Sequence, residues 1–212
     1  MTAAATAALS RLTGPIVIAS PNLIVRTMTP DDASDRFASW FAQADIREGL
    51  NLPAQSRTKA DIAAYIRGFD QRSNLLLGIF DKANDLSVGF FNIQIDWRIG
   101  RYLVNTVIGE PAYRTKGLML EVTLPFREYF FGALGLKVMT ATALASNAAI
   151  IGYLEKTGWT RNQTLKAHTK SHADGTMIDL HLYSITREAW AAWKAANPDT
   201  VQAMAKGLLR PS

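Results

Sequence analysis

The sequence predicts a mixed α/β fold of the α+β kind, with a mostly antiparallel central sheet flanked by helices. Apolar strand-like runs and stretches with helical spacing share the chain. Three of these runs follow one another with only short turns between them, which is typical of an antiparallel meander. With 212 residues, of which 48% are hydrophobic, the chain is long enough to bury a substantial core in one domain.

The first part of the chain is predicted to supply an extension, a strand and two helices. Residues 1–20 read as a partly flexible N-terminal extension, because they are Ala-rich and carry only a short strand-like run at their end. An apolar run predicts a strand over 22–29. Helices are predicted over 30–43, with two aspartates in the first turn, and over 58–71, which begins at a threonine cap. The proline-containing segment 44–57 is predicted to be a loop.

The middle of the chain predicts the meander and a long helix. Strands are predicted over 74–81, 86–97 and 101–109, separated by the turn-like sequences KAND and RIG. The stretch 118–135 is predicted to be helical from its length. Pro125 lies in its middle, where it removes one backbone hydrogen bond and is expected to kink or break the helix.

The last part of the chain predicts a second group of strands and helices. The short helix ends at Gly158, and the hairpin turns at Asp174-Gly175. The predicted elements are a strand over 136–144, a helix over 148–158, hairpin strands over 159–169 and 176–186, and a helix over 187–197. A single domain is therefore expected over 21–196, followed by a polar C-terminal tail over 197–212.

Composition excludes several classes of function. The chain has no cysteine, which excludes disulfides, thiolate metal sites and a thiol nucleophile and fits a reducing cytoplasm as the location. No apolar run approaches the roughly 20 residues of a membrane-spanning helix, so we expect no membrane anchor. The net charge of +5 permits an anionic partner. The basic residues are scattered and are not interleaved with aromatic residues, which argues against a nucleic-acid surface.

The stretch EPAYRTKGLMLEV, residues 110–122, lies where a predicted strand passes into a predicted helix. The first amides of a helix have no intrahelical acceptor and attract anions. Arg114 and Lys116 add positive charge, and Gly117 lets a ligand approach the backbone. A phosphate or pyrophosphate is the expected ligand, although two solvated cations in an ordinary loop give the same short pattern. Neither the Walker loop nor G-x-G-x-x-G occurs in the chain.

These residues resemble a known cofactor loop. The pattern Arg114-x-x-Gly117-x-Met119 is similar to the coenzyme A pyrophosphate loop, R/Q-x-x-G-x-G/A, of the GNAT superfamily of N-acetyltransferases. Other residues resemble the Rim-type branch, which acetylates ribosomal-protein N-termini, and these are Glu121, Asn147, Lys156, Gly158 and Trp159. The resemblance covers about residues 20–195 in the right order, which makes it much more specific than any one motif.

The resemblance implies a GNAT-like fold, with a mixed, mostly antiparallel sheet of about six or seven strands and a splayed central strand pair that holds acetyl-CoA. The pyrophosphate would lie on residues 114–119, and the pantetheine arm would run along the strand that ends at residue 109. The implied cofactor-binding residues are Val107, Ile108, Gly109, Arg114, Thr115, Lys116, Gly117, Leu118, Met119 and Asn147. No metal is implied, and a homodimer is the habit of the family.

The implied activity is transfer of an acetyl group from acetyl-CoA to a primary amine by direct attack in a ternary complex. The acceptor is a protein N-terminal α-amine or a small-molecule amine. An α-amine, with a pKa near 8, is already roughly a tenth neutral at pH 7, so it needs less help from a base than a lysine amine with a pKa of about 10.4. Trp40 and Trp97 are expected to border the groove for this acceptor.

Candidate catalytic residues follow from their positions. Glu110, Asp96 and Asp179 are candidate bases, although each also fits the role of a solvated or capping carboxylate. Tyr153 is the candidate acid for the leaving thiolate. Many GNAT enzymes carry this tyrosine one residue later, where the present chain has Leu154, about 100° further round the helix.

Two other interpretations stay open. A catalytically inactive coenzyme-A-binding module for regulation or partner binding is suggested by Met119, where the superfamily prefers Gly or Ala, by Leu154, and by the lack of an obvious base. Thr115 also replaces the usual glycine of the loop and would be strained at a positive φ. A basic scaffold that binds RNA rests on the net charge alone.

Overall fold

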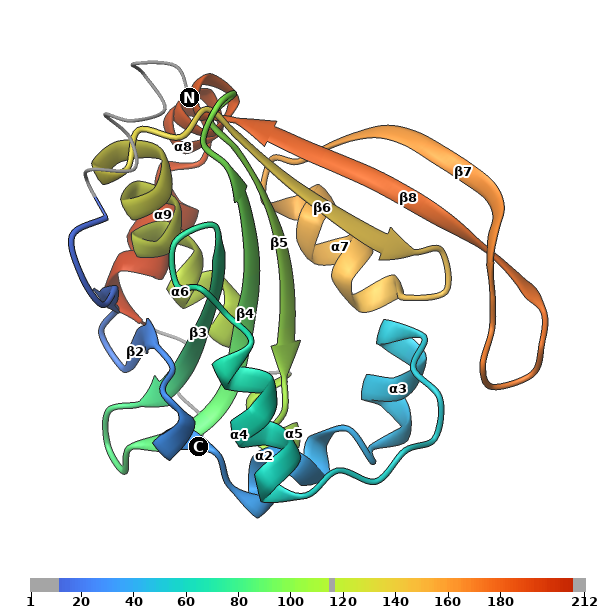
Figure 1. The fold of residues 1–212 in the computed structure, drawn as a ribbon. Helices are drawn as coiled ribbons and strands as arrows, with labels where there is room; N and C mark the ends of the chain where they lie inside the picture. Colours follow the sequence, from blue (N-terminus) through green and yellow to red (C-terminus); the bar gives the residue numbers. More distant parts are fainter. Residues whose placement is uncertain (1–11, 115–116, 208–212) are drawn as a thin grey trace.

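The computed structural model describes residues 12–114 and 117–207, and these form one sheet of eight strands in the order β1-β2-β3-β4-β5-β6-β8-β7 (Figure 1). The strands are β1 (Val17–Ala19), β2 (Leu23–Thr27), β3 (Asn74–Asp81), β4 (Leu86–Asp96), β5 (Arg101–Ile108), β6 (Val138–Leu144), β7 (Thr160–Lys170) and β8 (Met177–Thr186). Neighbouring strands are antiparallel except for β5 and β6, which run parallel. The predicted mixed, mostly antiparallel sheet is confirmed, with eight strands in place of the expected six or seven.

Helices cover both faces of this sheet (Figure 1). They are η1 (Pro30–Asp32), α2 (Asp35–Trp40), α3 (Ala44–Leu50), α4 (Lys59–Arg67), α5 (Pro111–Arg114), α6 (Leu118–Arg127), η2 (Glu128–Ala133), α7 (Ala148–Lys156), α8 (Arg187–Ala196) and α9 (Pro198–Lys206). No helix in the described part of the chain has both the length and the apolar composition needed to cross a membrane.

The core consists of two apolar clusters, one on each face of the sheet. Alternate residues of a strand point to opposite faces. In β4, Phe91 therefore packs against α6 in one cluster, whereas Phe90 packs against α2 and α4 in the other. Trp40 and Trp97 are only 1% and 7% exposed and belong to these two clusters. The expectation that they border an acceptor groove is therefore wrong.

Local capping changes two elements that were predicted in the N-terminal half. The helix predicted over 30–43 is divided, because Ser34 is extended and its side chain accepts a hydrogen bond from the Phe37 amide, so that α2 starts anew. The loop predicted over 44–57 is wrong for its first seven residues, which form α3. This short helix buries Ile46 and ends at Asn51 in the left-handed conformation.

The long central helix changes its hydrogen-bonding pattern near the proline. The α-helical part, α6, continues through Pro125 and ends at Arg127, and the chain then forms the π-helical turn η2. Proline cannot donate to the carbonyl four residues earlier, here Glu121. The predicted disturbance is thus seen as a change from α to π geometry shortly after Pro125.

Both ends of the described chain pack onto the domain. Strand β1 forms within the predicted N-terminal extension, and Ile16 and Ile18 join the core. The stretch 197–212, expected to be a polar tail, instead contains α9, which buries Met204 and packs on α6. Proline at its first position and Gly207 at its end are the signals that the sequence analysis missed.

The parallel pair β5 and β6 is joined over only three residue pairs, the last of which is Leu103 with Thr140. Beyond this point the two strands diverge, although β5 continues to Ile108 and β6 to Leu144 (Figure 1). The expected splayed central strand pair is therefore present. We call the opening between these two strand ends the splay.

Glu121 fixes the start of the sheet to α6. Its carboxylate is buried and accepts hydrogen bonds from the Ser20 hydroxyl at 2.6 Å, the Asn22 amide at 2.7 Å and the Asn22 side chain at 3.0 Å. All three partners donate to a carboxylate, which makes these bonds stronger than neutral ones. The helix that begins at the splay is thus held in place by a segment about a hundred residues away in the sequence.

The first prediction concerns this contact. Glu121→Gln replaces one acceptor oxygen with an NH2 group that faces donors, so we expect the free energy of unfolding to fall by about 2 kcal/mol. Urea denaturation measures the change. Glu48→Gln, at an exposed position of α3, is the matched control and should leave stability within about 0.5 kcal/mol of wild type. Equal stabilities of the two variants would contradict the role assigned to Glu121.

Candidate active site

A cleft of about 800 Å³ opens at the splay, between the end of β5, α3, and the first turns of α6 and α7. It brings together seven of the predicted site residues, which are Val107, Ile108, Arg114, Gly117, Met119, Asn147 and Tyr153. Four predicted cofactor-binding residues do not line it or are not described. Gly109 is not among the lining residues, Leu118 buries its side chain in the core and has only its main chain at the start of α6, and Thr115 and Lys116 lie outside the described residues.

The main-chain edge of β5 at the splay follows from its pairing with β4. The Gly109 amide donates to the Val88 carbonyl, on the side of β4. Because main-chain groups of alternate residues point to opposite edges, Val107 also faces β4, whereas Thr106 and Ile108 face the splay. Of the residues expected to bond a pantetheine arm through the main chain, Ile108 is therefore the one directed at the opening, with Thr106 as an addition.

Gly109 holds the end of β5 against α2. A Cβ atom on this glycine would lie 1.9 Å from Cδ2 of Trp40, so the indole ring occupies the space of a side chain. The close approach also lets the Trp40 indole donate a hydrogen bond to Glu110 at 2.9 Å. The position of this strand end is thus set by packing that only glycine allows.

Arg114 folds back onto the end of β5. Its Nε donates to the Ile108 carbonyl at 2.9 Å, and its Nη2 donates to the Gly109 carbonyl at 2.9 Å. The same guanidinium contacts the side chains of Gln43 and Asp45, and its partial burial lowers the pKa of Arg114. The positive charge therefore sits at the mouth of the cleft and links β5 to α3.

The start of α6 leaves main-chain donors free of a capping side chain. Gly117 is the N-cap, with a φ of 68°, and no described side chain accepts from the first turn. A left-handed N-cap of this kind favours glycine, as the sequence has it. The Leu120 and Glu121 amides donate to the Gly117 carbonyl, so the amides left without a described acceptor are those of Leu118 and Met119. Amides of this kind at the start of a helix suit the oxygens of a phosphate or pyrophosphate, such as that of coenzyme A.

Asn147 and Tyr153 bring α7 to the cleft. The Asn147 side chain caps the helix by accepting from the Ile150 amide at 3.2 Å, and it contacts the Gly49 carbonyl of α3 at 3.4 Å. Tyr153 lines the cleft, and its hydroxyl lies 2.6 Å from that of Thr123. Leu154, at the usual position of the tyrosine acid, is 1% exposed and packs in the core.

The candidate base Glu110 is held in an ion-pair network beside the cleft. One carboxylate oxygen accepts from the Trp40 indole, and the other pairs with Arg36 at 3.1 Å. Both oxygens therefore have partners, and Glu110 is not among the residues that line the cleft. The structure gives it a role in fixing the turn that follows β5.

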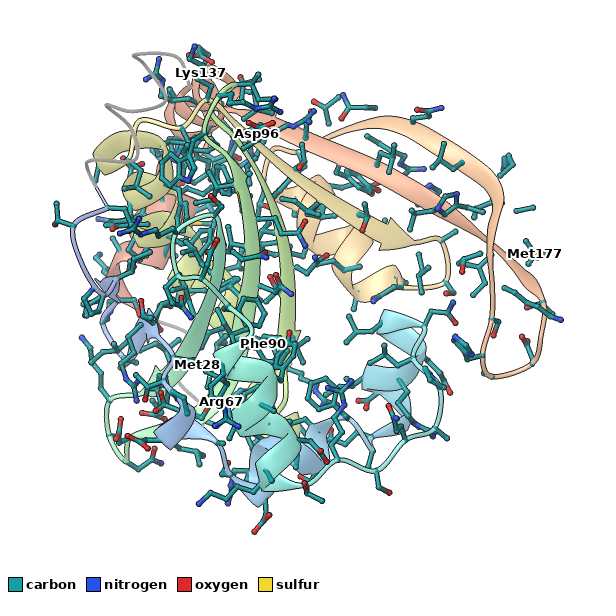
Figure 2. All side chains as sticks on the ribbon, viewed as in Figure 1. Met28, Arg67, Phe90, Asp96, Lys137 and Met177 are labelled. Atoms are coloured by element: carbon teal, nitrogen blue, oxygen red, sulfur yellow. The ribbon has the colours of Figure 1, made fainter. Side chains whose placement is uncertain are left out.

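The other two candidate bases lie away from Tyr153. Asp179 pairs with Lys166 at 2.8 Å and accepts from the Ala167 amide, and these contacts lower its pKa. Asp96 pairs with Arg98, which likewise lowers the pKa of Asp96. Figure 2 shows Asp96 toward the end of the sheet where Lys137 lies, away from Phe90 and from α3. The structure does not bring these carboxylates into the cleft.

A wider hollow of about 1010 Å³ adjoins the cleft between α3 and the β7–β8 hairpin. Asn51 closes one side of it, because its amide nitrogen donates to the Lys170 carbonyl at 2.9 Å and its oxygen accepts from the His172 amide at 2.9 Å. This contribution of α3 and its end was not predicted, because the proline-containing sequence of 44–57 favours a loop.

Thr123 and Arg127 are the other residues that the sequence analysis missed. Both lie on α6 and line a small cavity behind the cleft. Their spacing of four residues, within a stretch rich in apolar residues, is the signal that places two polar groups on one helix face. In 12–114 and 117–207, no three His, Cys, Asp or Glu side chains are grouped so that they could hold a metal ion.

Comparison with known proteins agrees with this geometry. The family model for the acetyltransferase (GNAT) domain matches residues 22–160. A GCN5-related N-acetyltransferase from Brucella melitensis has a TM-score of 0.73 at 16% identity, over 91% of this chain and 86% of that one. The ribosomal-protein-S5-alanine acetyltransferase of Vibrio fischeri has a TM-score of 0.69 at 16% identity, over 82% and 98%.

A spermidine N-acetyltransferase from Vibrio cholerae, solved with CoA and spermine, has a TM-score of 0.70 at 13% identity, over 80% of this chain and 98% of that one. At these identities the structures show a shared fold. A search of curated proteins finds no match. Since the family model spans more than half of the chain and the fold agrees with it, the chain belongs to the GNAT family of acetyltransferases.

Proposed function

We propose that this acyltransferase moves the acetyl group of acetyl-CoA to a primary amine by direct attack in a ternary complex. The observation that carries the proposal is the cleft at the splay. There the end of β5 beyond its pairing with β6, the start of α6 and Tyr153 line one volume. The family match supports the reaction class, and the geometry supports the assignment of roles.

Three parts of the cleft would hold the cofactor, which supplies an activated acetyl thioester. The amides that follow Gly117 would bind the pyrophosphate, together with the positive charge of Arg114. The Ile108 amide and the Thr106 main-chain groups would pair with the pantetheine arm as a neighbouring strand does, since the Ile108 carbonyl is bonded to Arg114. Asn147, at the opposite side of the cleft, would fix the position of α7 against the arm.

The acceptor amine is best matched by a protein N-terminus or a small amine. Asp45 is the one acidic side chain among the described residues that line the cleft, and Arg114 pairs with it. An acceptor that loses its proton to solvent suits this site, and an α-amine does so far more readily than a lysine side chain. The wide hollow beside α3 suits a peptide end. The resemblance to the Rim-type branch supports the same choice, and the S5-alanine enzyme of Vibrio fischeri is named for such a substrate.

Tyr153 is the proposed proton donor to the departing sulfur. Tyr153 lines the cleft, whereas Leu154, at the position where many GNAT enzymes have the tyrosine acid, is buried. Tyr153 is therefore the phenol at the cleft in which the leaving thiolate would form. In this mechanism the Tyr153 hydroxyl keeps its proton until it transfers it to the sulfur of the leaving group.

The second prediction tests the reaction and this role together. With acetyl-CoA and a panel of N-terminal peptides and free amines, the wild-type protein should release thiol, and Tyr153→Phe should lower kcat by about 100-fold with an unchanged Kd for CoA. Tyr129→Phe, which changes a phenol away from the cleft, is the control. Binding of CoA without thiol release from any acceptor would refute the enzyme and favour the inactive binding module.

The third prediction concerns the charge at the mouth of the cleft. Arg114→Glu should weaken CoA binding by more than about tenfold, because it reverses a charge beside the proposed pyrophosphate site. Isothermal titration measures the Kd, and Lys166→Glu, on the exposed hairpin, serves as the charge-matched control. An unchanged Kd for CoA in Arg114→Glu would contradict the placement of the pyrophosphate beside Arg114.

A further inference from the structure

Behind the cleft lies a smaller cavity of about 100 Å³, which reaches between α6, α7 and the diverging strands. Its polar lining includes Thr123 and Arg127 from α6 and Tyr153 from α7. Thr123 is 3% exposed and Arg127 is 1% exposed, so both side chains are removed from bulk solvent. Burying a polar side chain away from water costs free energy unless it forms hydrogen bonds. The hydrogen bonds of Thr123 and Arg127 therefore indicate how the two side chains are stabilised.

The hydrogen bond between Thr123 and Tyr153 has a defined direction. The Thr123 hydroxyl donates its single hydrogen to the Met119 carbonyl, which has no hydrogen to offer in return. The 2.6 Å contact between the two hydroxyls must therefore use the hydrogen of Tyr153. Tyr153 thus donates to Thr123, and the lone pairs of its oxygen are left for other partners.

Arg127 places a buried positive charge next to this pair. Its guanidinium donates to the Thr157 carbonyl at 2.7 Å and lies 4.6 Å from the centre of the Trp190 ring. Among the described residues, its Nε has no hydrogen-bond partner and no carboxylate forms an ion pair with it. Burial lowers the pKa of Arg127, and the nearby phenols of Tyr153 and Tyr102 oppose this effect. An anion beside Arg127 would therefore be strongly favoured.

We propose that Thr123 and Arg127 are positioning residues that prepare Tyr153 to protonate a departing thiolate, an inference that rests on the proposed function. Tyr153 gives its hydroxyl proton to the sulfur as the carbon–sulfur bond breaks and the carbon–nitrogen bond to the amine forms. The phenolate that remains is held by Thr123, which turns its O–H from the Met119 carbonyl to the phenolate oxygen. Arg127 supplies the compensating charge.

The proton balance closes through solvent. The attacking nitrogen loses one proton to water, and water returns one proton to the phenolate of Tyr153.

Several elements bring charged and titratable groups near the phenol. These groups are Arg127 on α6, Tyr102 on β5, Lys156 on α7, and the paired Arg114 and Asp45 at the mouth of the cleft. On the far side of α7, Glu155 pairs with Arg161.

The fourth prediction uses Thr123→Val, which keeps the shape of the side chain and removes its hydroxyl, with Thr123→Ser as the matched control. We expect kcat to fall by about 10- to 100-fold in Thr123→Val, as for the loss of a hydrogen bond to a charged oxygen, and by less than about threefold in Thr123→Ser. The KM for the amine and the Kd for CoA should stay unchanged in both. A lower kcat with an unchanged KM and Kd would show that Thr123 acts on the proton transfer and not on binding.

A second measurement uses the free protein and does not depend on turnover. The ¹³Cζ resonance of Tyr153, assigned by its absence in Tyr153→Phe, should move in Thr123→Val and stay in place in Thr123→Ser. Equal kcat values in the two Thr123 variants, with a wild type that releases thiol, would overturn the inference alone. A wild type that acetylates no amine would overturn the proposed function and the inference with it.

Arg127 is tested by kcat in variants that keep or remove its charge. Without the positive charge the phenolate that forms during the reaction is less stabilised, so Arg127→Met should lower kcat by about 10-fold or more, whereas Arg127→Lys should restore most of the activity. The KM for the amine and the Kd for CoA should stay unchanged in both variants. Melting temperatures establish that the variants fold. An unchanged kcat in folded Arg127→Met would overturn the role of Arg127, and the Thr123 variants decide the inference if that variant does not fold.

Discussion

The early end of the pairing between β5 and β6 is the constraint on which the rest of the site depends. A parallel strand pair that continued past Leu103 and Thr140 would satisfy the main-chain groups of Thr106 and Ile108 and would fill the cleft with backbone. Because the strands diverge, these groups need other partners, and the Ile108 carbonyl finds one in the Arg114 guanidinium. The side chains that line the opening, from Arg114 to Tyr153, surround these main-chain groups.

Packing on both sides of the sheet keeps the opening in place. On one face, Trp40 presses against Gly109 and fixes the last residues of β5. On the other, α6 is anchored by Glu121 to the first turn of the sheet and by Arg127 to the end of α7. The helix that starts at the cleft is thus attached to the fold at two points, which fixes the position of its first turn.

Sequence patterns predicted the elements whose signals are local. The meander and the hairpin were found because apolar alternation and a turn at Asp174-Gly175 are visible in a short window. Helix α3 was not predicted, because Ile46 packs in a core cluster whose other residues are far from it in the sequence. The predicted bases failed to enter the cleft because their ion-pair partners, such as Arg36 for Glu110, are brought by tertiary contacts that no spacing rule contains.

The bridge from Asn51 to the hairpin has a consequence for the wider hollow. Because one amide side chain binds both a carbonyl and an N–H of the facing segment, the hairpin cannot move away from the end of α3 at this point without breaking two hydrogen bonds at once. The side of the hollow that Asn51 closes is therefore held by tertiary contacts between segments more than a hundred residues apart in the sequence.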